Sequence, residues 1–131
     1  MKAIVTGGAG FIGSHLVDLL LTDNINVTVL DNFSTGRPEN LDHVREQIKL
    51  VECDLSVKGD WIQHFDKADW VFHLAALADI VPSIQQPEAY FRANVDGTFN
   101  VLQAAKAAEV TRFIYIASSS CYGIPDKYPT P

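Results

Sequence analysis

Three consecutive serines, Ser118–Ser120, are the clearest candidates for reactive side chains in this sequence. They follow the apolar run RFIYIA (112–117) and come just before Tyr122 and a stretch that contains prolines. A serine hydroxyl can hydrogen-bond a substrate, but it does not act as a base at neutral pH without a partner. The pattern therefore predicts either a site that takes its base from elsewhere or simply a polar exit from a strand.

A glycine-rich turn, TGGAGFIG (6–13), is the second group with evident chemistry. Gly8, Gly10 and Gly13 form G-x-G-x-x-G, and Gly7, Gly10 and Gly13 form G-x-x-G-x-x-G. In either spacing one glycine permits a tight turn, one lets a pyrophosphate approach, and one lets helix and strand pack closely. Because the turn joins an expected strand to an expected helix, it predicts a dinucleotide site rather than a turn without a ligand.

An acidic residue, Asp31, follows the second apolar run in the sequence LDNFSTG (30–36). A carboxylate about 20 residues after such glycines accepts hydrogen bonds from the adenosine ribose and repels a 2′-phosphate. This predicts NAD rather than NADP, although Arg37 is a possible partner for a 2′-phosphate. Asp54 and Leu55 end the next run and are expected beside the adenine, but aspartate is also a common turn residue.

Alternating strands and helices must position these groups. The predicted strands have near-continuous apolar character, which is typical of strands buried on both faces of a parallel sheet; they span 2–6, 26–30, 48–52, 69–74 and 112–117. The predicted helices span 11–22, 38–47, 59–65 and 87–108. Gly97 falls inside the longest helix, where it costs about 1 kcal/mol relative to alanine, so we expect close packing there.

Right-handed crossovers convert this order of elements into an α/β fold with a doubly wound parallel sheet, a Rossmann fold with strand order 3-2-1-4-5. The length suits one domain, here 1–131. The expected sixth strand of a complete two-halved fold does not occur in this sequence.

Composition excludes several classes of protein. The net charge of −6 argues against a nucleic-acid or anionic-membrane binder, and no apolar run is long enough for a membrane helix. The four histidines show no metal-ligand spacing, so we expect no metal. The two cysteines, Cys53 and Cys121, do not form C-x-x-C, and we expect a cytoplasmic protein with both thiols reduced.

Six motifs, in this order, resemble the extended short-chain dehydrogenase/reductases that act on nucleotide sugars. They are TGGAGFIG, LDNFSTG, CDL, HLAA, NVDGTFNVL and SSSCYG. The similarity extends over the whole chain and is greatest to the NAD-dependent UDP-hexose 4-epimerases of carbohydrate metabolism. The loop DNFSTGRPENL (31–41) in particular is similar to the loop after the second strand of these enzymes.

This resemblance implies a role for each matching position. The residues that would bind the pyrophosphate are Gly7, Gly10, Phe11, Ile12 and Gly13, and those that would surround the adenosine ribose are Asp31, Asn32, Thr35 and Gly36. Asp54 and Leu55 would flank the adenine, and Leu74, Ala75 and Ala76 would line the inner part of the cofactor site. The resemblance assigns the hydroxyl that binds the reacting sugar to Ser118. His73 and Asn94 are expected to be structural, and Ala78 stands where some epimerases carry a lysine beside the nicotinamide.

The base of the family, the tyrosine of a Tyr-x-x-x-Lys pair, has no match among these residues, since Asp126 stands four positions after Tyr122. We therefore expect the chain to be the N-terminal, NAD-binding part of a longer, homodimeric enzyme with a UDP-hexose substrate, inactive alone. The alternatives are a nucleotide-sugar reductase, decarboxylase or dehydratase, or a non-catalytic NAD-binding module. Dehydration is disfavoured because serines replace the carboxylate that would act as acid and base in water loss.

Overall fold

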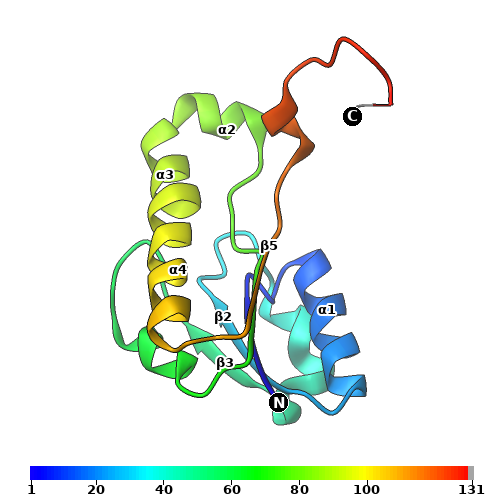
Figure 1. The fold of residues 1–131 in the computed structure, drawn as a ribbon, viewed down its shortest axis with the longest axis vertical. Helices are drawn as coiled ribbons and strands as arrows, with labels where there is room; N and C mark the ends of the chain where they lie inside the picture. The colour runs from blue at the N-terminus through cyan, green and yellow to red at the C-terminus, as the bar shows by residue number, and fades with distance from the viewer. Residues whose placement is uncertain (130–131) are drawn as a thin grey trace.

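The computed structural model describes residues 1–129 as a five-stranded parallel sheet with helices on both faces (Figure 1). The strand order β3-β2-β1-β4-β5 confirms the predicted doubly wound sheet. The strands are β1 (Lys2–Thr6), β2 (Asn26–Asp31), β3 (Lys49–Glu52), β4 (Trp70–His73) and β5 (Arg112–Tyr115). The last two residues of the expected 1–131 domain lie outside the described residues.

The parallel register brings the carboxyl ends of all five strands to one edge of the sheet. Thr6, the last residue of β1, pairs with Leu30 on one side and with His73 on the other. The expected strand over 112–117 is shorter than predicted, because β5 ends at Tyr115, opposite the last residue of β4. The loops that follow the strands therefore meet at this edge, where ligands bind in such sheets.

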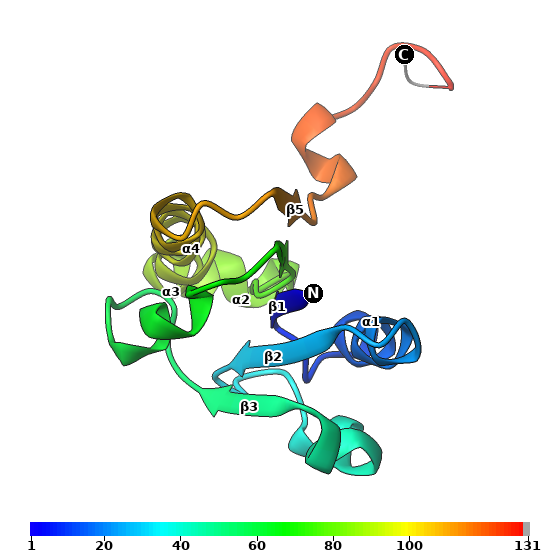
Figure 2. The same ribbon diagram turned by 60° about the horizontal axis from the view of Figure 1, so that its bottom comes forward.

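Two hydrophobic cores lie on opposite faces of the sheet, and Figure 2 shows the helices that cover these faces. Successive residues of a strand point to opposite faces, so Val5 packs in one core and Ile4 in the other. The first core is covered by α1 (Phe11–Thr22) and the 3-10 helix η1 (Pro38–Gln47). The second is covered by the 3-10 helix η2 (Asp60–Phe65) and α4 (Gly97–Ala107). Burial on both faces explains why the strands are apolar throughout.

The predicted helix over 87–108 is one helical stretch of three segments. It consists of α3 (Pro87–Phe91), the π-helical turn η3 (Arg92–Asp96) and α4. The backbone remains in the right-handed helical region across both junctions. A π-turn inside an α-helix often marks a functional site, and this one faces the carboxyl edge of the sheet.

One helix, α2 (Ile80–Gln85), was not predicted. Pro82 lies in its first turn, where the backbone N–H groups have no partner within the helix. Proline is therefore tolerated there, although a proline within an apolar run usually indicates a helix boundary.

The close packing expected at Gly97 is not found. A β-carbon built on Gly97 would lie 3.7 Å from the Leu55 Cβ and 3.7 Å from the Arg92 carbonyl oxygen, which are ordinary contact distances. We therefore expect Gly97→Ala to raise the free energy of unfolding by about 0.5–1 kcal/mol, because alanine restricts the unfolded chain and favours a helix. Urea unfolding measures this change, and a destabilised variant would show that the helix needs glycine here.

Beyond β5 the chain runs away from the sheet, as the orange-to-red segment of Figure 1 shows. This segment carries the short 3-10 helix η4 (Ser119–Tyr122), and its apolar side chains are exposed. Over residues 1–129, no helix combines the length and the apolar character that a membrane crossing requires.

Candidate functional site: a cavity at the carboxyl edge of the sheet

A cavity of about 560 Å³ lies at the carboxyl edge of the sheet. The loops after the first four strands and the helical stretch α3–η3 enclose it. Its lining residues are Gly7 and Gly10; Asp31, Asn32, Ser34, Thr35 and Gly36; Cys53, Asp54, Leu55, Ser56 and Val57; Leu74, Ala75, Ala76 and Leu77; and Glu88, Ala89, Arg92 and Ala93. Its volume is within the range of cofactor sites.

The glycine turn requires glycine for three different reasons. Gly7 has a φ of +71°, and a β-carbon there would lie 2.7 Å from the Ala75 nitrogen. Gly10 precedes α1 and borders the cavity. A β-carbon on Gly13 would overlap the Gly7 carbonyl oxygen. The turn, the cavity wall and the helix packing thus involve Gly7, Gly10 and Gly13. Gly8 is also tightly packed, since a β-carbon there would lie 2.6 Å from the Val29 Cγ1, so both glycine spacings fit the structure.

The first turn of α1 presents backbone N–H groups that have no partner within the helix. The first amide bonded along this helix is that of Ser14, which donates to the Gly10 carbonyl at 2.9 Å. Phe11 and Ile12 do not line the cavity, and their side chains are 78% and 64% exposed. Any part they have in holding a phosphate would come from their backbone, as at other helix N-termini.

Asp31 joins the glycine turn to the loop after β2. Its side chain is only 6% exposed. Oδ2 accepts a hydrogen bond from the Ala9 N–H at 2.9 Å, and Oδ1 accepts one from the Phe33 N–H at 2.8 Å. Each carboxylate oxygen keeps further acceptor capacity, and the residue borders the cavity. The carboxylate can therefore organise the turn and accept ribose hydroxyls at once.

Hydrogen bonds hold both the N–H group and the carbonyl group of Ala9. Its carbonyl accepts hydrogen bonds from the Arg37 N–H at 3.0 Å and from the Asn40 side-chain amide at 2.8 Å. Gly36 packs against the same residue, since a β-carbon there would lie 3.1 Å from the Ala9 Cβ. Loop 32–40 is thereby fixed to the glycine turn. Asn40 lies inside the loop DNFSTGRPENL (31–41), but sequence reasoning gave it no role.

The segment after β3 supplies the next wall. Asp54 Oδ1 accepts hydrogen bonds from the Ser56 N–H at 2.9 Å and the Ser56 hydroxyl at 2.7 Å, which leaves Oδ2 for a ligand. Leu55 is buried, and its carbonyl accepts from the Asn100 side chain. Burial, with a smaller contribution from the charges of Asp31 and Asp54, raises the pKa of the Cys53 thiol to about 11. Cys53 is therefore a protonated wall residue and no nucleophile.

The comparison with known sequences decides the family. Residues 3–131 match the sequence model of the NAD dependent epimerase/dehydratase family. The chain belongs to this family. The match covers nearly all of the chain, so it includes every wall of the cavity.

Three relatives show where the chain falls within the family. UDP-glucose 4-epimerase of Mycolicibacterium smegmatis is 40% identical over 136 residues, which cover 99% of this chain and 43% of that protein. UDP-glucuronic acid decarboxylase 1 of Danio rerio is 37% identical over 130 residues, 98% of this chain and 30% of that protein. The solved structure of UDP-N-acetylglucosamine 4-epimerase from Methanobrevibacter ruminantium superposes with a TM-score of 0.91 at 37% sequence identity. The match covers 99% of this chain and 42% of the epimerase chain. The chain thus spans less than half the length of these relatives.

The cavity of this epimerase/dehydratase-family chain fits the family's cofactor, NAD. Gly7 and Gly10 border the cavity next to the N-terminus of α1 and carry no side chain. The Asp31 carboxylate offers acceptors for ribose hydroxyls, and Ala75 and Ala76 present small side chains on the inner wall. Among residues 1–129 no group of three or more metal-ligating side chains is placed to hold a metal ion.

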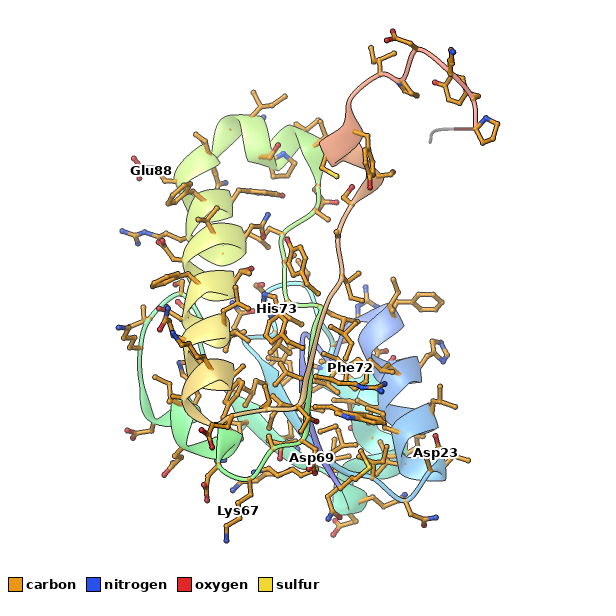
Figure 3. All side chains as sticks on the ribbon, in the orientation of Figure 1. Asp23, Lys67, Asp69, Phe72, His73 and Glu88 are labelled. Atoms are coloured by element: carbon orange, nitrogen blue, oxygen red, sulfur yellow. The ribbon has the colours of Figure 1, made fainter. Side chains whose placement is uncertain are left out.

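His73 lies in the interior, between the sheet and the helical stretch α3–α4, whereas Phe72 points toward α1 (Figure 3). Its side chain is 1% exposed. The Thr98 hydroxyl donates to the Asn94 carbonyl, so it accepts from His73 Nε2 at 2.9 Å. The Thr6 hydroxyl accepts the Leu74 and Ala75 N–H groups and donates to His73 Nδ1 at 2.7 Å. These partners require a neutral imidazole with its proton on Nε2.

The free energy of unfolding is expected to decrease as the pH is lowered, because of His73. Burial lowers the pKa of folded His73 from 6.5 to about 4. Between these two values the unfolded chain binds a proton that the folded chain does not. The stabilisation is therefore complete above pH 6.5, and it decreases as the pH falls toward 4, by roughly 3 kcal/mol in total.

Proton NMR of the histidine rings and urea unfolding between pH 7.5 and 4.5 test this expectation. His15→Gln, a change at an exposed histidine of α1, is the control and should leave the pH dependence intact. A His73 ring that titrates near 6.5 would contradict the buried neutral form.

Asn94 lies within the π-helical turn and fixes the loop after β4. Its side-chain oxygen accepts from the Leu77 N–H at 2.8 Å, and its amide donates to the Leu77 carbonyl at 2.9 Å. This pair holds the loop that forms the inner cavity wall against the helical stretch. The expected structural role of Asn94 thus has a definite geometry in the fold.

Ser118 lies apart from the cavity lining. It is exposed at the start of η4, where its hydroxyl donates to the Ser120 hydroxyl at 3.0 Å and accepts from the Ser120 N–H at 3.2 Å. Cys121 beside it is a free, exposed cysteine. The structure therefore does not bring the predicted catalytic serine together with the predicted cofactor residues.

Several lining residues were not predicted from sequence. Ser34 and Cys53 lie inside the motifs LDNFSTG and CDL, and Ser56, Val57, Leu77, Arg92 and Ala93 lie one or two residues outside a motif, so including whole motifs and their neighbours would have found them. Glu88 and Ala89 carry no such signal. They reach the cavity because the π-turn and α3 pack over the edge of the sheet.

Proposed function

We propose that this chain, residues 1–131, is the NAD-binding part of a nucleotide-sugar 4-epimerase that acts on UDP-hexoses. The observation that carries the proposal is the buried Asp31 carboxylate joined to the glycine turn at the cavity. Relatives named UDP-glucose 4-epimerase support the reaction, and the solved relative in complex with UDP-N-acetylmuramic acid supports a sugar nucleotide as substrate.

When bound, NAD would supply the acceptor for a hydride from C4 of the sugar and the donor for its return to the opposite face. In the proposed site the N-terminus of α1 and the glycine turn bind the pyrophosphate, and Asp31, Asn32, Thr35 and Gly36 surround the adenosine ribose. Asp54 and Leu55 flank the adenine, and Leu74–Ala76 line the inner part of the cofactor. The assignment is supported by the position of most of these residues in the lining of one cavity, namely Gly7, Gly10, Asp31, Asn32, Thr35, Gly36, Asp54, Leu55, Leu74, Ala75 and Ala76.

The sugar chemistry requires two further groups. We assign the hydrogen bond to the reacting sugar hydroxyl to Ser118, which requires that segment 116–122 approach the inner cavity wall when substrate is bound. No tyrosine of this sequence is followed four positions later by lysine. We therefore assign the base to a segment that this sequence does not include, and propose that these residues alone are inactive.

A decarboxylase is the second candidate, because UDP-glucuronic acid decarboxylase 1 is 37% identical over 98% of this chain. Dehydration is less favoured, since Ser119 and Ser120 offer no carboxylate beside Ser118. A reductase of nucleotide sugars or a non-catalytic NAD-binding module would use the same cavity without C4 epimerisation.

We also propose that the full-length gene product is a cytoplasmic homodimer that binds neither nucleic acid nor membrane. Phe91, Val95, Phe99 and Leu102 lie on one side of the helical stretch and are 44–59% exposed, a stripe suited to a partner subunit. The free cysteines agree with a reducing compartment, and the net charge of −6 opposes binding to polyanions. Sedimentation analysis of the full-length product tests the dimer.

The function is tested by incubating the full-length gene product with NAD and single UDP-sugars and following the sugar signals by NMR. Interconversion of UDP-glucose and UDP-galactose, with the hydrogen at C4 retained, is the expected result. Release of carbon dioxide from UDP-glucuronate without epimerisation would identify the decarboxylase instead. No conversion of any UDP-sugar in the presence of bound NAD would favour the non-catalytic module.

A further inference from the structure

The cavity carries more acidic than basic side chains. Asp31, Asp54 and Glu88 line it, and Arg92 is the one basic residue among its lining residues. NAD brings a pyrophosphate with two negative charges into this acidic surrounding. The dipole of α1 offsets part of this charge from one side, and a cation on the opposite wall would offset more.

Arg92 occupies that opposite wall. It is the first residue of the π-turn and lines the cavity. In Figure 1 the helical stretch that carries it lies on the opposite side of the molecule from α1, the helix that follows the glycine turn. Its carbonyl lies 3.7 Å from the β-carbon position of Gly97, which is itself 3.7 Å from Leu55. The backbone of Arg92 therefore lies near Leu55, which is expected to flank the adenine, and Arg92 shares the cavity with Gly7 and Gly10 of the glycine turn.

The guanidinium of Arg92 is available for a ligand. The residue is exposed, and the ion pair found within residues 1–129 joins His43 and Asp18 on another part of the surface. Glu88 stands one helical turn earlier on the same wall, yet no ion pair joins it to Arg92 within the described chain. An unpaired guanidinium beside a phosphate site can make two parallel hydrogen bonds to phosphate oxygens.

Resting on the proposed function, we propose that Arg92 binds the pyrophosphate of NAD from the α3–η3 wall, opposite the glycine turn. The phosphates are then held between backbone amides on one side and a guanidinium on the other. The contact belongs to every ligand with an adenosine diphosphate group and is absent for adenosine itself.

Titrations of the full-length gene product with NAD, ADP and adenosine test this assignment. We expect Arg92→Gln to weaken binding of NAD and of ADP about tenfold, and to leave adenosine binding, measured by competition, within about twofold. Arg92→Lys should fall between, because an ammonium keeps the charge but loses the bidentate geometry. Raising the salt concentration should weaken NAD binding by the wild type more than by Arg92→Gln.

Lys106→Gln is the matched control, since it removes an exposed positive charge from the same helical stretch outside the cavity lining. It should leave NAD binding unchanged. Equal NAD affinity in the wild type and Arg92→Gln would overturn the assignment, and so would an equal loss for adenosine, which would place Arg92 on the adenine. Failure of the wild type itself to bind NAD would instead refute the proposed function, so the two failures are distinguishable.

Discussion

Gly13→Ala is expected to lower the free energy of unfolding by about 3 kcal/mol. A β-carbon at this position would overlap the Gly7 carbonyl oxygen and lie 2.7 Å from the Gly8 Cα. Both contacts are backbone atoms of the turn beside the cavity, so relief requires the turn and α1 to move apart. NAD binding should therefore weaken together with stability. Urea unfolding and NAD titration of the full-length product measure the two effects.

Gly97→Ala provides the comparison, because it adds the same methyl group to another buried helical glycine that has ordinary contacts. We expect opposite signs for the two variants. A Gly13→Ala protein as stable as the wild type, with unchanged NAD affinity, would show that the close contact between α1 and the turn is not needed.

Asp31→Asn is expected to lower the free energy of unfolding by about 2 kcal/mol and NAD affinity by about 10- to 100-fold. The carboxylate accepts hydrogen bonds from two backbone N–H groups, those of Ala9 and Phe33. An asparagine amide would place a donor against one of these donors, in a position where the side chain is only 6% exposed. It would also remove the negative charge that favours ribose hydroxyls.

The control is Asp54→Asn, assessed for stability alone. Asp54 is exposed and its carboxylate is bonded only to Ser56 in the part of the chain that the structure describes, so its loss should change stability by less than about 1 kcal/mol. Equal destabilisation by the two variants would contradict the special role of Asp31 in organising the turn.

Much of the fold followed from local patterns. The strands are short apolar runs because both faces of the sheet are covered, and α1 has the predicted limits because a glycine turn and a polar segment bound it. The local sequence patterns did not predict the π-turn or α2. The π-turn contains Asn94, whose side chain is hydrogen-bonded to Leu77 in another segment, a contact that local patterns do not encode. Pro82 lies in the first turn of α2, where a proline usually indicates a helix boundary.

The candidate site likewise contains residues that the sequence patterns predicted and residues that they did not. Gly7, Asp31 and Asp54 are adjacent to strand ends, so a parallel sheet brings them together. Arg92 lines the cavity through the packing of the helical stretch, and Asn40 holds the glycine turn from the loop after β2; the sequence patterns gave neither residue a role. Ser118 was predicted by position after β5, yet the segment that carries it runs away from the sheet in this structure.

The measurement that tests the central claim most directly is a calorimetric titration of the full-length gene product with NAD and with NADP. The claim is that the Asp31 cavity binds NAD, and Arg37, the one candidate partner for a 2′-phosphate, does not line it. We predict one NAD bound per chain and affinity for NADP at least about 100-fold weaker, because a 2′-phosphate would face the Asp31 carboxylate. Equal binding of NADP, or no binding of either dinucleotide, would contradict the account.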